Sequence, residues 1–258
     1  MPNWVRNHLT ITGEKASSVL KELLTENKES YCGYDFDFNK ILPMPEPLNI
    51  VSGSETKNGL NLYLTSLNPS VDYFGDKKLS PEDFTKTIKS LREKCAFIQC
   101  FLSEEEIQAL TKHNSMQKLM DLGKKAFNNF VEYGAIDWYD WCCDNWGTKW
   151  NACETHVAAD NPTDVYFDTA WSPVRDLMRF LSKKYPDCTF YYDYAEEQPG
   201  YFAGEFVFKN GSCLEICLFQ DYSKKAYEKY FDLWGGEDLF EFNPQTGTYE
   251  HIENEGEM

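Results

Sequence analysis

An Asn-Gly pair at positions 210 and 211 constrains the fold of this chain more strongly than any other feature of its sequence. It separates two runs of alternating apolar and polar residues, AGEFVFK at 203–209 and SCLEICL at 212–218. Both central residues of a type I′ turn need positive φ, which Asn and Gly adopt at low cost. The pattern therefore predicts an antiparallel hairpin whose register is fixed by a two-residue turn.

Shorter periodic patterns predict further strands and helices along the chain. Alternation predicts strands at 8–12, 35–41, 165–169 and 189–195. Apolar residues at helical spacing predict helices at 14–25, 103–134 and 223–234, and Ser-Pro caps at 80–81 and 172–173 open two more, the second reaching Tyr185. The segment 48–80 is rich in Ser, Asn, Gly and Pro, and it predicts a loop with one strand near 60–64. Because strands and helices intermix and a hairpin joins two strands, we expect an α+β fold on an antiparallel sheet.

The composition is that of a folded chain. Of 258 residues, 42% are hydrophobic and 16% aromatic, which supports a large core and excludes a disordered chain. No apolar run approaches the ~20 residues that a membrane-spanning helix needs. The N-terminal MPNWVRNHLTITG has no basic segment before an apolar one, so we expect no secretory signal and a cytoplasmic location.

Nine cysteines are present, an odd number without a CxxC pair, so we expect reduced thiols that pack in the core. Cys142, Cys143, Cys153 and His156 are four possible zinc ligands. Their spacing is not a usual zinc pattern, because adjacent cysteines rarely point to one centre. Packed thiols are the preferred interpretation, zinc is the weaker alternative, and no cofactor is predicted.

The chain carries 25 basic and 42 acidic residues, a formal net charge of −17, and its longest basic clusters are pairs. Such a surface repels phosphate backbones, so direct binding to nucleic acid is not expected. The same charge can mimic nucleic acid and attract a basic nucleic-acid-binding host protein. The simpler interpretation is that acidity keeps the chain soluble, and both stay open.

Four tryptophans lie within WYDWCCDNWGTKWNACETH at 138–156, and Trp171 follows nearby. Indole rings bury large areas, so the simpler hypothesis is that these residues pack a helix against a sheet. The alternative is a surface on which a base, a sugar or a partner's side chain stacks. The candidate binding surface consists of Trp146, Lys149, Trp150, Asn151, Trp171, Glu196 and Glu197. If 148–153 is a strand, alternation places Trp150 opposite Lys149 and Asn151, unless a bulge intervenes.

Asp168, Glu196 and Glu197 are the candidate acid–base groups of an enzyme. Paired carboxylates can move protons or hold a divalent metal, which suits a nucleotide or a phosphorylated substrate. Adjacent glutamates arise easily by chance among 42 acidic residues, so a solvated turn is the simpler interpretation. The four histidines show no catalytic spacing with Ser or Cys, and no catalytic residue is assigned.

Five segments in order carry a resemblance to a known family: PNWVRNHLTITG near the start, FDFNKILPMPEPL at 36–48, NWGTKWNA at 145–152, FDTAWSPV at 167–174 and YAEEQPGYFAGEFVFKNG at 194–211. Together they resemble the YubB-type proteins of phages, prophages and plasmids. The resemblance implies a ferredoxin-like α+β sandwich in the C-terminal half, a term for topology and not for an iron–sulfur cluster, and a bacterial host cell. It assigns no biochemical function. The position after NWGTKWNA tends to be aromatic in that family and is Cys153 here, which argues against a family-wide role for this thiol.

We therefore expect a ferredoxin-like antiparallel sheet packed with helices, plus a largely helical insertion. The expected segments are 1–48, a strand–helix–strand unit that packs with the C-terminal half; 49–134, the loop and helical insertion; 135–240, the ferredoxin-like domain; and 241–258, an acidic, mobile tail. The expected function is a non-enzymatic binding or interaction protein of a phage or mobile element, with a protein partner. A small enzyme that uses the acid–base groups above is the alternative.

Overall fold

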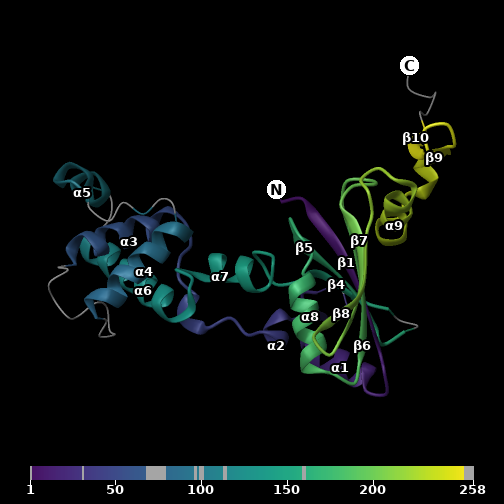
Figure 1. Cartoon of the computed structure of the whole chain (residues 1–258), viewed down its shortest axis with the longest axis horizontal. Coiled ribbons are helices and arrows are strands. Elements are labelled where there is room, and N and C mark those ends of the chain that lie inside the picture. Colours follow the sequence, from purple (N-terminus) through teal and green to yellow (C-terminus); the bar gives the residue numbers. More distant parts are fainter. Residues whose placement is uncertain are drawn as a thin grey trace. The chain divides into compact units, whose positions relative to one another are not determined.

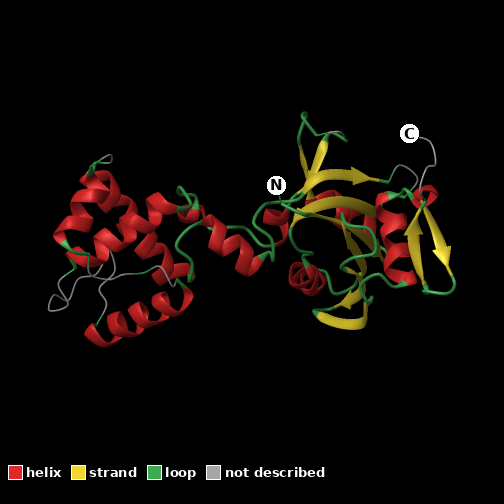
Figure 2. Cartoon of the chain, turned by 90° about the horizontal axis from the view of Figure 1, so that it is seen from above, coloured by secondary structure: helices red, strands yellow, loops and turns green. Residues whose placement is uncertain are grey.

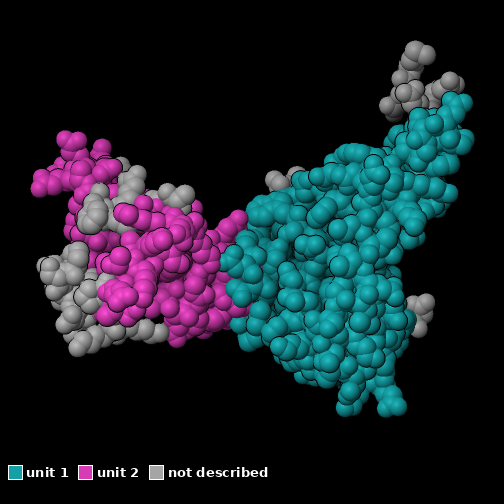
Figure 3. Space-filling model, in the orientation of Figure 1, with its two compact units in different colours: residues 1–43, 143–258 teal, residues 44–142 magenta. Residues whose placement is uncertain are grey.

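The computed structural model describes residues 2–30, 32–67, 80–95, 98, 102–112, 115–158 and 161–252. The chain forms two compact units, coloured separately in Figure 3. Unit 1 contains Met1–Pro43 and Cys143–Met258, and unit 2 contains Met44–Cys142. The sequence suggested divisions at 48 and 134 instead. The side chain of Asn129 donates hydrogen bonds to the carbonyl groups of Pro47 and Ile136, which ties both boundary segments to unit 2.

Unit 1 is built on a six-stranded antiparallel sheet with the order β4-β5-β1-β6-β7-β8 (Figure 1). Its strands are β1 (Trp4–Thr12), β4 (Cys153–Val157), β5 (Asp164–Ala170), β6 (Thr189–Glu196), β7 (Ala203–Lys209) and β8 (Ser212–Leu218). The expected α+β fold class is confirmed. The hairpin predicted between β7 and β8 is present, and Asn210 and Gly211 have φ angles of 47° and 76°.

Strand register assigns the side chains of the sheet to two faces, because neighbouring residues alternate. On the first face, Tyr192 lies beside Leu9 and Phe206. Helix α8 (Arg175–Lys184) covers this face, and the N–H of Val174 donates to the Tyr192 hydroxyl. Contacts through α2 (Phe38–Ile41) add α1 (Ala16–Leu23) to the same layer. Helix α9 (Lys224–Trp234) packs on β1, β6 and β7 from the opposite side. We refer to the α8 face and the α9 face.

Two local predictions in unit 1 are wrong. The strand predicted at 35–41 stops at Phe36, where β3 (Tyr34–Phe36) pairs with β2 (Leu24–Glu26). The side chain of Asp37 then accepts a hydrogen bond from the Asn39 N–H and caps α2. The Ser-Pro cap at 172–173 is not used, because the Ser172 hydroxyl donates to the Gly147 carbonyl and α8 begins at Arg175.

Part of the tail predicted at 241–258 contains secondary structure. After the 3-10 turn η2 (Glu237–Leu239), β9 (Phe240–Asn243) and β10 (Thr248–His251) form a hairpin. The ring centre of Tyr249 lies 5.1 Å from that of Phe231 on α9, so aromatic contacts hold the hairpin beside this helix (Figure 2). Residues 253–258 of the predicted tail lie outside the described residues.

Unit 2 is helical in its described part. Its elements are η1 (Glu46–Leu48), α3 (Ser54–Ser66), α4 (Pro81–Lys94), α5 (Glu104–Thr111), α6 (Met116–Tyr133) and α7 (Trp138–Asn145), of which α7 continues into unit 1. Ser80 caps α4 as predicted, and Ser103 caps α5. The strand expected near 60–64 is wrong, because α3 is helical there, and residues 68–79 of the same predicted loop lie outside the described residues.

Helices α3 and α6 cross closely at Gly59 and Gly123 in unit 2. A Cβ added to Gly123 would lie 2.0 Å from the Gly59 carbonyl oxygen, so only hydrogen fits between the two backbones. Leu60, Leu91 and Phe127 form the buried core beside this crossing. Among the described residues of either unit, no helix is both long and apolar enough to cross a membrane.

Candidate functional site

One end of the sheet gathers many of the residues that the sequence singled out. Strand β1 begins there, β5, β6 and β8 end there, and β7 starts there, because neighbouring strands are antiparallel. Backbone hydrogen bonds join the connecting segments. The Trp171 N–H donates to the Asn3 carbonyl over 2.8 Å, and the Glu197 N–H donates to the Trp4 carbonyl over 2.8 Å. We call this region the sheet end, and the N-terminus lies at it in Figure 1.

The first group of side chains at the sheet end, the Trp cluster, consists of Trp4, Lys149, Trp150 and Trp171. The Lys149 Nζ atom lies 3.6 Å from the ring centre of Trp150 and 3.9 Å from that of Trp171. The ring centres of Trp4 and Trp150 are 6.1 Å apart. Trp150 and Trp171 remain 38% and 48% exposed. The lysine therefore orders two indoles on the surface through cation–π contact.

The second group, the Tyr cluster, consists of Tyr201, Phe202 and Tyr222, which come from the β6–β7 turn and the segment after β8. Their side chains are 38%, 39% and 47% exposed. Ring centres of Tyr201 and Tyr222 are 6.2 Å apart. The turn depends on Gly200, which has a φ of 72° and whose Cβ would lie 2.5 Å from the Tyr227 ring.

Three of these exposed aromatic residues have a left-handed backbone. Among the described residues, the non-glycine positions with positive φ are Glu154, Trp171, Phe202, Asn210 and Tyr222. This conformation costs an L residue about 1–2 kcal/mol. Hydrogen bonds from the backbone N–H groups hold it, for example from Phe202 to the Asp221 carboxylate over 3.1 Å. Such strain gathers at binding and catalytic sites, where the rest of the structure maintains it.

Glu196 and Glu197 differ in their surroundings although they are adjacent. Glu196 is buried, and its carboxylate accepts hydrogen bonds from the Asn3 side chain over 2.6 Å and from the Gln198 N–H over 3.2 Å. Glu197 is exposed. Glu196 therefore braces the turns of the sheet end, while Glu197 supplies negative charge on its surface.

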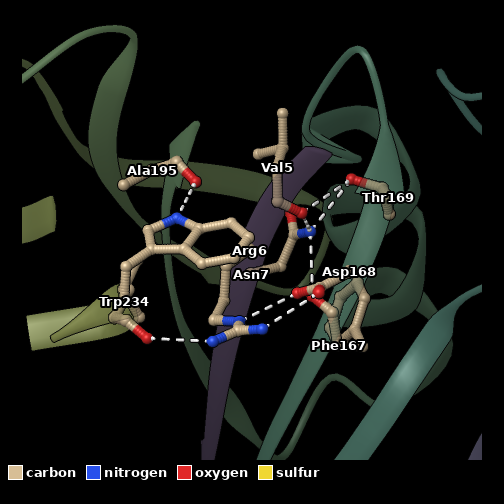
Figure 4. Close-up of polar contacts among 9 residues, drawn as sticks. Val5, Arg6, Asn7, Phe167, Asp168, Thr169, Ala195 and Trp234 are labelled. Carbon is tan, nitrogen blue, oxygen red and sulfur yellow. Dashed lines mark hydrogen bonds and ion pairs between the residues drawn. The ribbon is translucent and has the colours of Figure 1, made fainter. Parts of the chain in front are cut away.

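Asp168 lies on the α9 face and holds Arg6 (Figure 4). The Arg6 Nε donates to Oδ1 over 2.9 Å, and its terminal nitrogen donates to Oδ2 over 3.1 Å. The guanidinium also lies 4.0 Å from the ring centre of Trp234, whose Nε1 donates to the Ala195 carbonyl. Because both oxygens of Asp168 bind arginine, this carboxylate anchors the end of α9.

A second ionic group lies on the α9 face farther along the sheet. His8 Nδ1 lies 2.9 Å from Asp193 Oδ1, and the Lys229 ammonium donates to Asp193 and Glu205, each over 2.9 Å. Burial acts to raise the pKa of Asp193, but the His8 hydrogen bond and the Lys229 charge outweigh it and hold that pKa below 3.8. Burial acts to lower the pKa of Lys229, and the two carboxylates raise it above 10.5.

Replacing Asp193 with Asn is expected to lower the free energy of unfolding by about 2 kcal/mol, because Lys229 loses a charged partner in a largely buried site. The folded-state pKa of Asp193 lies below its value of 3.8 in the unfolded chain. The stability that ionised Asp193 contributes is therefore fully present above pH 3.8, and it is lost as the pH falls through the folded-state pKa. Urea unfolding at about pH 7 and about pH 2 should show a difference between D193N and wild type that shrinks in acid.

The control for this measurement is Asp176→Asn, which removes an exposed partner of Arg179. Its free energy of unfolding should change by less than ~0.5 kcal/mol. An equal loss for D193N at both pH values would show that ionisation of Asp193 does not carry the effect.

The four possible zinc ligands lie in pairs on two elements. Cys142 and Cys143 are on α7, and the Cys142 thiol lies 3.8 Å from the Met44 sulfur. Cys153 and His156 are on β4, and burial raises the pKa of the Cys153 thiol. Within the described ranges, no group of three or more His, Cys, Asp or Glu side chains is placed to hold a metal ion.

His156 instead borders a cavity on the α9 face. The cavity has a volume of about 380 Å³ and is lined by Arg6, Glu154, Thr155, His156, Tyr166 and Leu233. The rings of Tyr166 and His8 stack with centres 4.3 Å apart at one side of it. Since the guanidinium of Arg6 is already paired with Asp168, the cavity offers mainly ring faces and the exposed Glu154 carboxylate.

Besides the buried Glu196, two further residues of the candidate binding surface point inward. Trp146 is 4% exposed, and its Nε1 donates to the Leu42 carbonyl over 2.9 Å. The Asn151 side chain accepts from the Phe38 N–H and donates to Asp37, each over 2.8 Å. Residues 147–151 are bends and no strand, so alternation does not apply and Lys149 can lie over its neighbour Trp150.

Most strands of the sheet and most residues of the sheet end lie in the segment that begins at the end of α7. Residues 145–236 match the family model for the ferredoxin-like domain in Api92-like protein. The matched segment runs from Asn145 through Gly236 and contains β4 to β8, α8 and α9. Strand β1 lies outside it and supplies a central strand of the same sheet.

A solved structure is also similar, the crystal structure of a protein api92 from Yersinia pseudotuberculosis, with 12% sequence identity and a TM-score of 0.37. The similarity covers 85% of this chain and 99% of that chain. No curated protein matches this chain.

Sequence reasoning missed the Tyr cluster of the ferredoxin-like domain and the part that Trp4 plays in the Trp cluster. The available signal was QPGYF at 198–202, in which two aromatics directly follow a Pro-Gly turn. Aromatic residues inside a turn have few neighbours to pack against, so this signal pointed to exposed rings.

Proposed function

We propose that this chain is a non-enzymatic binding protein whose ferredoxin-like domain contacts a protein partner through the sheet end. The observation that carries the proposal is the left-handed backbone of three exposed aromatic residues, Trp171, Phe202 and Tyr222. Each of these residues keeps 39–48% of its surface in water although its backbone costs about 1–2 kcal/mol, so the free chain buries these side chains only in part. Aromatic side chains of this kind dominate the binding energy of protein interfaces.

The charge of the chain indicates the chemistry of the partner. Unit 1 has 14 basic and 28 acidic residues, a net charge of −14, whereas unit 2 has 11 and 14, a net charge of −3. The acidity therefore belongs mainly to the unit that carries the sheet end. A basic partner would be attracted to it and a phosphate backbone repelled.

The proposal includes the partner that the sequence analysis considered. The partner is a basic, nucleic-acid-binding host protein, and the acidic unit occupies the surface that nucleic acid would use. A YubB-type origin from a phage or mobile element, in the cytoplasm of a bacterial host, belongs to the same proposal and rests on the sequence resemblance.

The pair Asp168 and Glu196, two of the three carboxylates that motivated the enzyme alternative, gives it no support. Register places Glu196 beside Val5 on the α8 face, and Asp168 beside Arg6 on the α9 face. Two carboxylates on opposite faces of one sheet cannot act together on a substrate.

Replacing Trp150 and Trp171 together with Ala is expected to weaken partner binding at least tenfold, because exposed aromatic anchors carry most of the energy of an interface. The tagged chain, immobilised at about 0.15 M salt, should retain a basic protein from host-cell lysate. The double variant should retain at least tenfold less of that same protein.

The matched control is Phe180→Ala, since Phe180 is 43% exposed on α8 and lies away from the sheet end. It should retain as much partner as wild type, and circular dichroism should confirm that all variants are folded. The proposal fails if the double variant and F180A retain equal amounts, or if the retained protein is acidic.

A further inference from the structure

Strand β8 forms one edge of the six-stranded sheet and is unusually apolar for an edge. In the described sheet it pairs with β7 on one side and with no strand on the other. Leu214, Ile216 and Leu218 are 57%, 64% and 60% exposed. Natural edge strands are protected by Lys, Pro or inward charges, because their free backbone groups are a template for another strand. The sequence SCLEICL contains neither Lys nor Pro.

The register shows which backbone groups of β8 are available. The Phe219 N–H donates to the Ala203 carbonyl, so Phe219 and Ala203 face each other as a hydrogen-bonded pair. Such pairs alternate along an antiparallel ladder. The pairs Gly204–Leu218 and Phe206–Ile216 are therefore non-hydrogen-bonded pairs. The N–H and C=O groups of Leu218 and Ile216 consequently point outward from the sheet.

The side chains of β8 divide by face. Ile216 lies beside Phe206, and Leu218 beside Gly204, on the α8 face but beyond the cover of α8. Glu215 lies on the α9 face beside Val207. A bulge at Leu214 disrupts the ladder only at the first half of the strand. An added strand would thus meet apolar side chains on one face and a carboxylate on the other.

We infer that the β8 edge binds an extended segment of a basic protein partner, in which apolar and basic residues alternate, as an added antiparallel strand. This inference rests on the proposed function, because it assigns the chemistry of that partner. Main-chain hydrogen bonds to Ile216 and Leu218 supply affinity, and the alternating side chains supply specificity. Apolar residues of the segment pack beside Ile216 and Leu218, and basic residues face Glu215.

Charge distinguishes this occupant from a second copy of the chain. Each unit 1 has a net charge of −14, so pairing two β8 edges brings two acidic units together, whereas a basic segment is attracted. The edge also continues into the sheet end, since Tyr222 of the Tyr cluster follows Leu218 by four residues. One partner can therefore contact both.

The test uses a ten-residue peptide of alternating Val and Lys with the full chain. Two control peptides alternate Val and Glu, or carry the same Val and Lys residues in two blocks. The alternating Val/Lys peptide should bind with at least tenfold higher affinity than either control peptide. When it is bound, hydrogen exchange should slow at the amides of Ile216 and Leu218. Raising the salt concentration should weaken binding.

Variants of the edge separate main-chain pairing from general attraction. Ile216→Pro removes an outward N–H without breaking a bond to β7, so the chain should stay folded and lose at least tenfold in affinity. Leu218→Lys should also weaken binding, because it replaces an apolar contact by a charge that repels the Lys residues of the peptide. Leu239→Lys, at a leucine that is 47% exposed outside β8, is its matched control and should bind normally.

Undiminished binding by I216P, or equal binding of the Val/Glu or block peptide, would overturn the inference. So would slow exchange at Ile216 and Leu218 without peptide, accompanied by a dimer in sedimentation, because a second copy would then occupy the edge. The proposed function fails separately, when W150A/W171A still captures the protein partner.

Discussion

Replacing Gly123 with Ala is expected to destabilise unit 2 by about 3 kcal/mol, the largest loss that we expect from adding one methyl group to this chain. The added Cβ would lie 2.0 Å from the Gly59 carbonyl oxygen and 2.8 Å from the Tyr63 Cβ. Neither the backbone of α3 nor the first side-chain carbon of Tyr63 can rotate away, so the two helices must separate. Separation loosens the core around Leu60 and Phe127.

The sign of the G123A effect makes the result diagnostic. In an isolated helix, Ala is more favourable than Gly by about 1 kcal/mol, so local propensity alone predicts stabilisation. Hydrogen exchange of the full chain should show faster exchange over Ser54–Ser66 and Met116–Tyr133, with β1 and β6 unchanged. The control Met116→Ala alters an exposed residue of the same helix and should change stability by less than ~0.5 kcal/mol. Stabilisation by G123A would show that α3 and α6 do not cross at these glycines.

Replacing Asn7 with Leu is expected to destabilise unit 1 by about 3 kcal/mol, because it leaves several buried polar groups without partners. Asn7 is fully buried in β1. Its amide nitrogen donates hydrogen bonds to the Val5 carbonyl over 2.8 Å and to the Phe167 carbonyl over 3.1 Å (Figure 4). Its oxygen accepts the Tyr192 hydroxyl over 2.6 Å. Leucine has a similar volume and none of these groups.

A double-mutant cycle separates this network from packing. Tyr192→Phe removes the other side of one hydrogen bond, so N7L and Y192F should be less than additive, by about 1 kcal/mol. Urea unfolding followed by tryptophan fluorescence measures each variant. Thr12→Val, at the exposed end of the same strand, is the control and should be nearly neutral. Full additivity of N7L and Y192F would mean that the bond between them contributes nothing.

Features of the fold that depend on neighbouring residues could be predicted from the sequence. The β7–β8 hairpin depends on the positive φ of Asn210 and Gly211, which their own chemistry permits. The caps at Ser80 and Ser103 satisfy N–H groups three residues away. Strand alternation in β5 and β6 likewise reports on one face of each strand.

Helix α3 could not be predicted, because its residues favour a loop. Its sequence SETKNGLNLYLTS includes a glycine, two asparagines and four Ser or Thr residues, all weak helix formers. The helix forms because Gly59 allows a close crossing with α6, and that partner lies about sixty residues farther along the chain. Packing of this kind outweighs local preference.

The tryptophans show the same division at the candidate site. The sequence allowed two hypotheses for the same tryptophans, packing of a helix against a sheet and a surface on which a ligand stacks, and it did not show which rings serve which purpose. Trp146 is buried because its N–H reaches the Leu42 carbonyl, whereas Trp171 is exposed because a hydrogen bond to Asn3 holds its backbone in a left-handed turn. Each of these contacts joins segments more than one hundred residues apart.

The sequence by itself determined the α+β class, the hairpin and the acidity of the chain, because these follow from local periodicity, turn chemistry and composition. Only the tertiary structure decided which aromatic rings face solvent, which faces Asp168 and Glu196 occupy, and that β8 is an edge. Those properties depend on the strand order β4-β5-β1-β6-β7-β8, in which the first strand of the chain lies between its fifth and sixth. Such an order is set by the burial of one shared face, and no single segment contains that information.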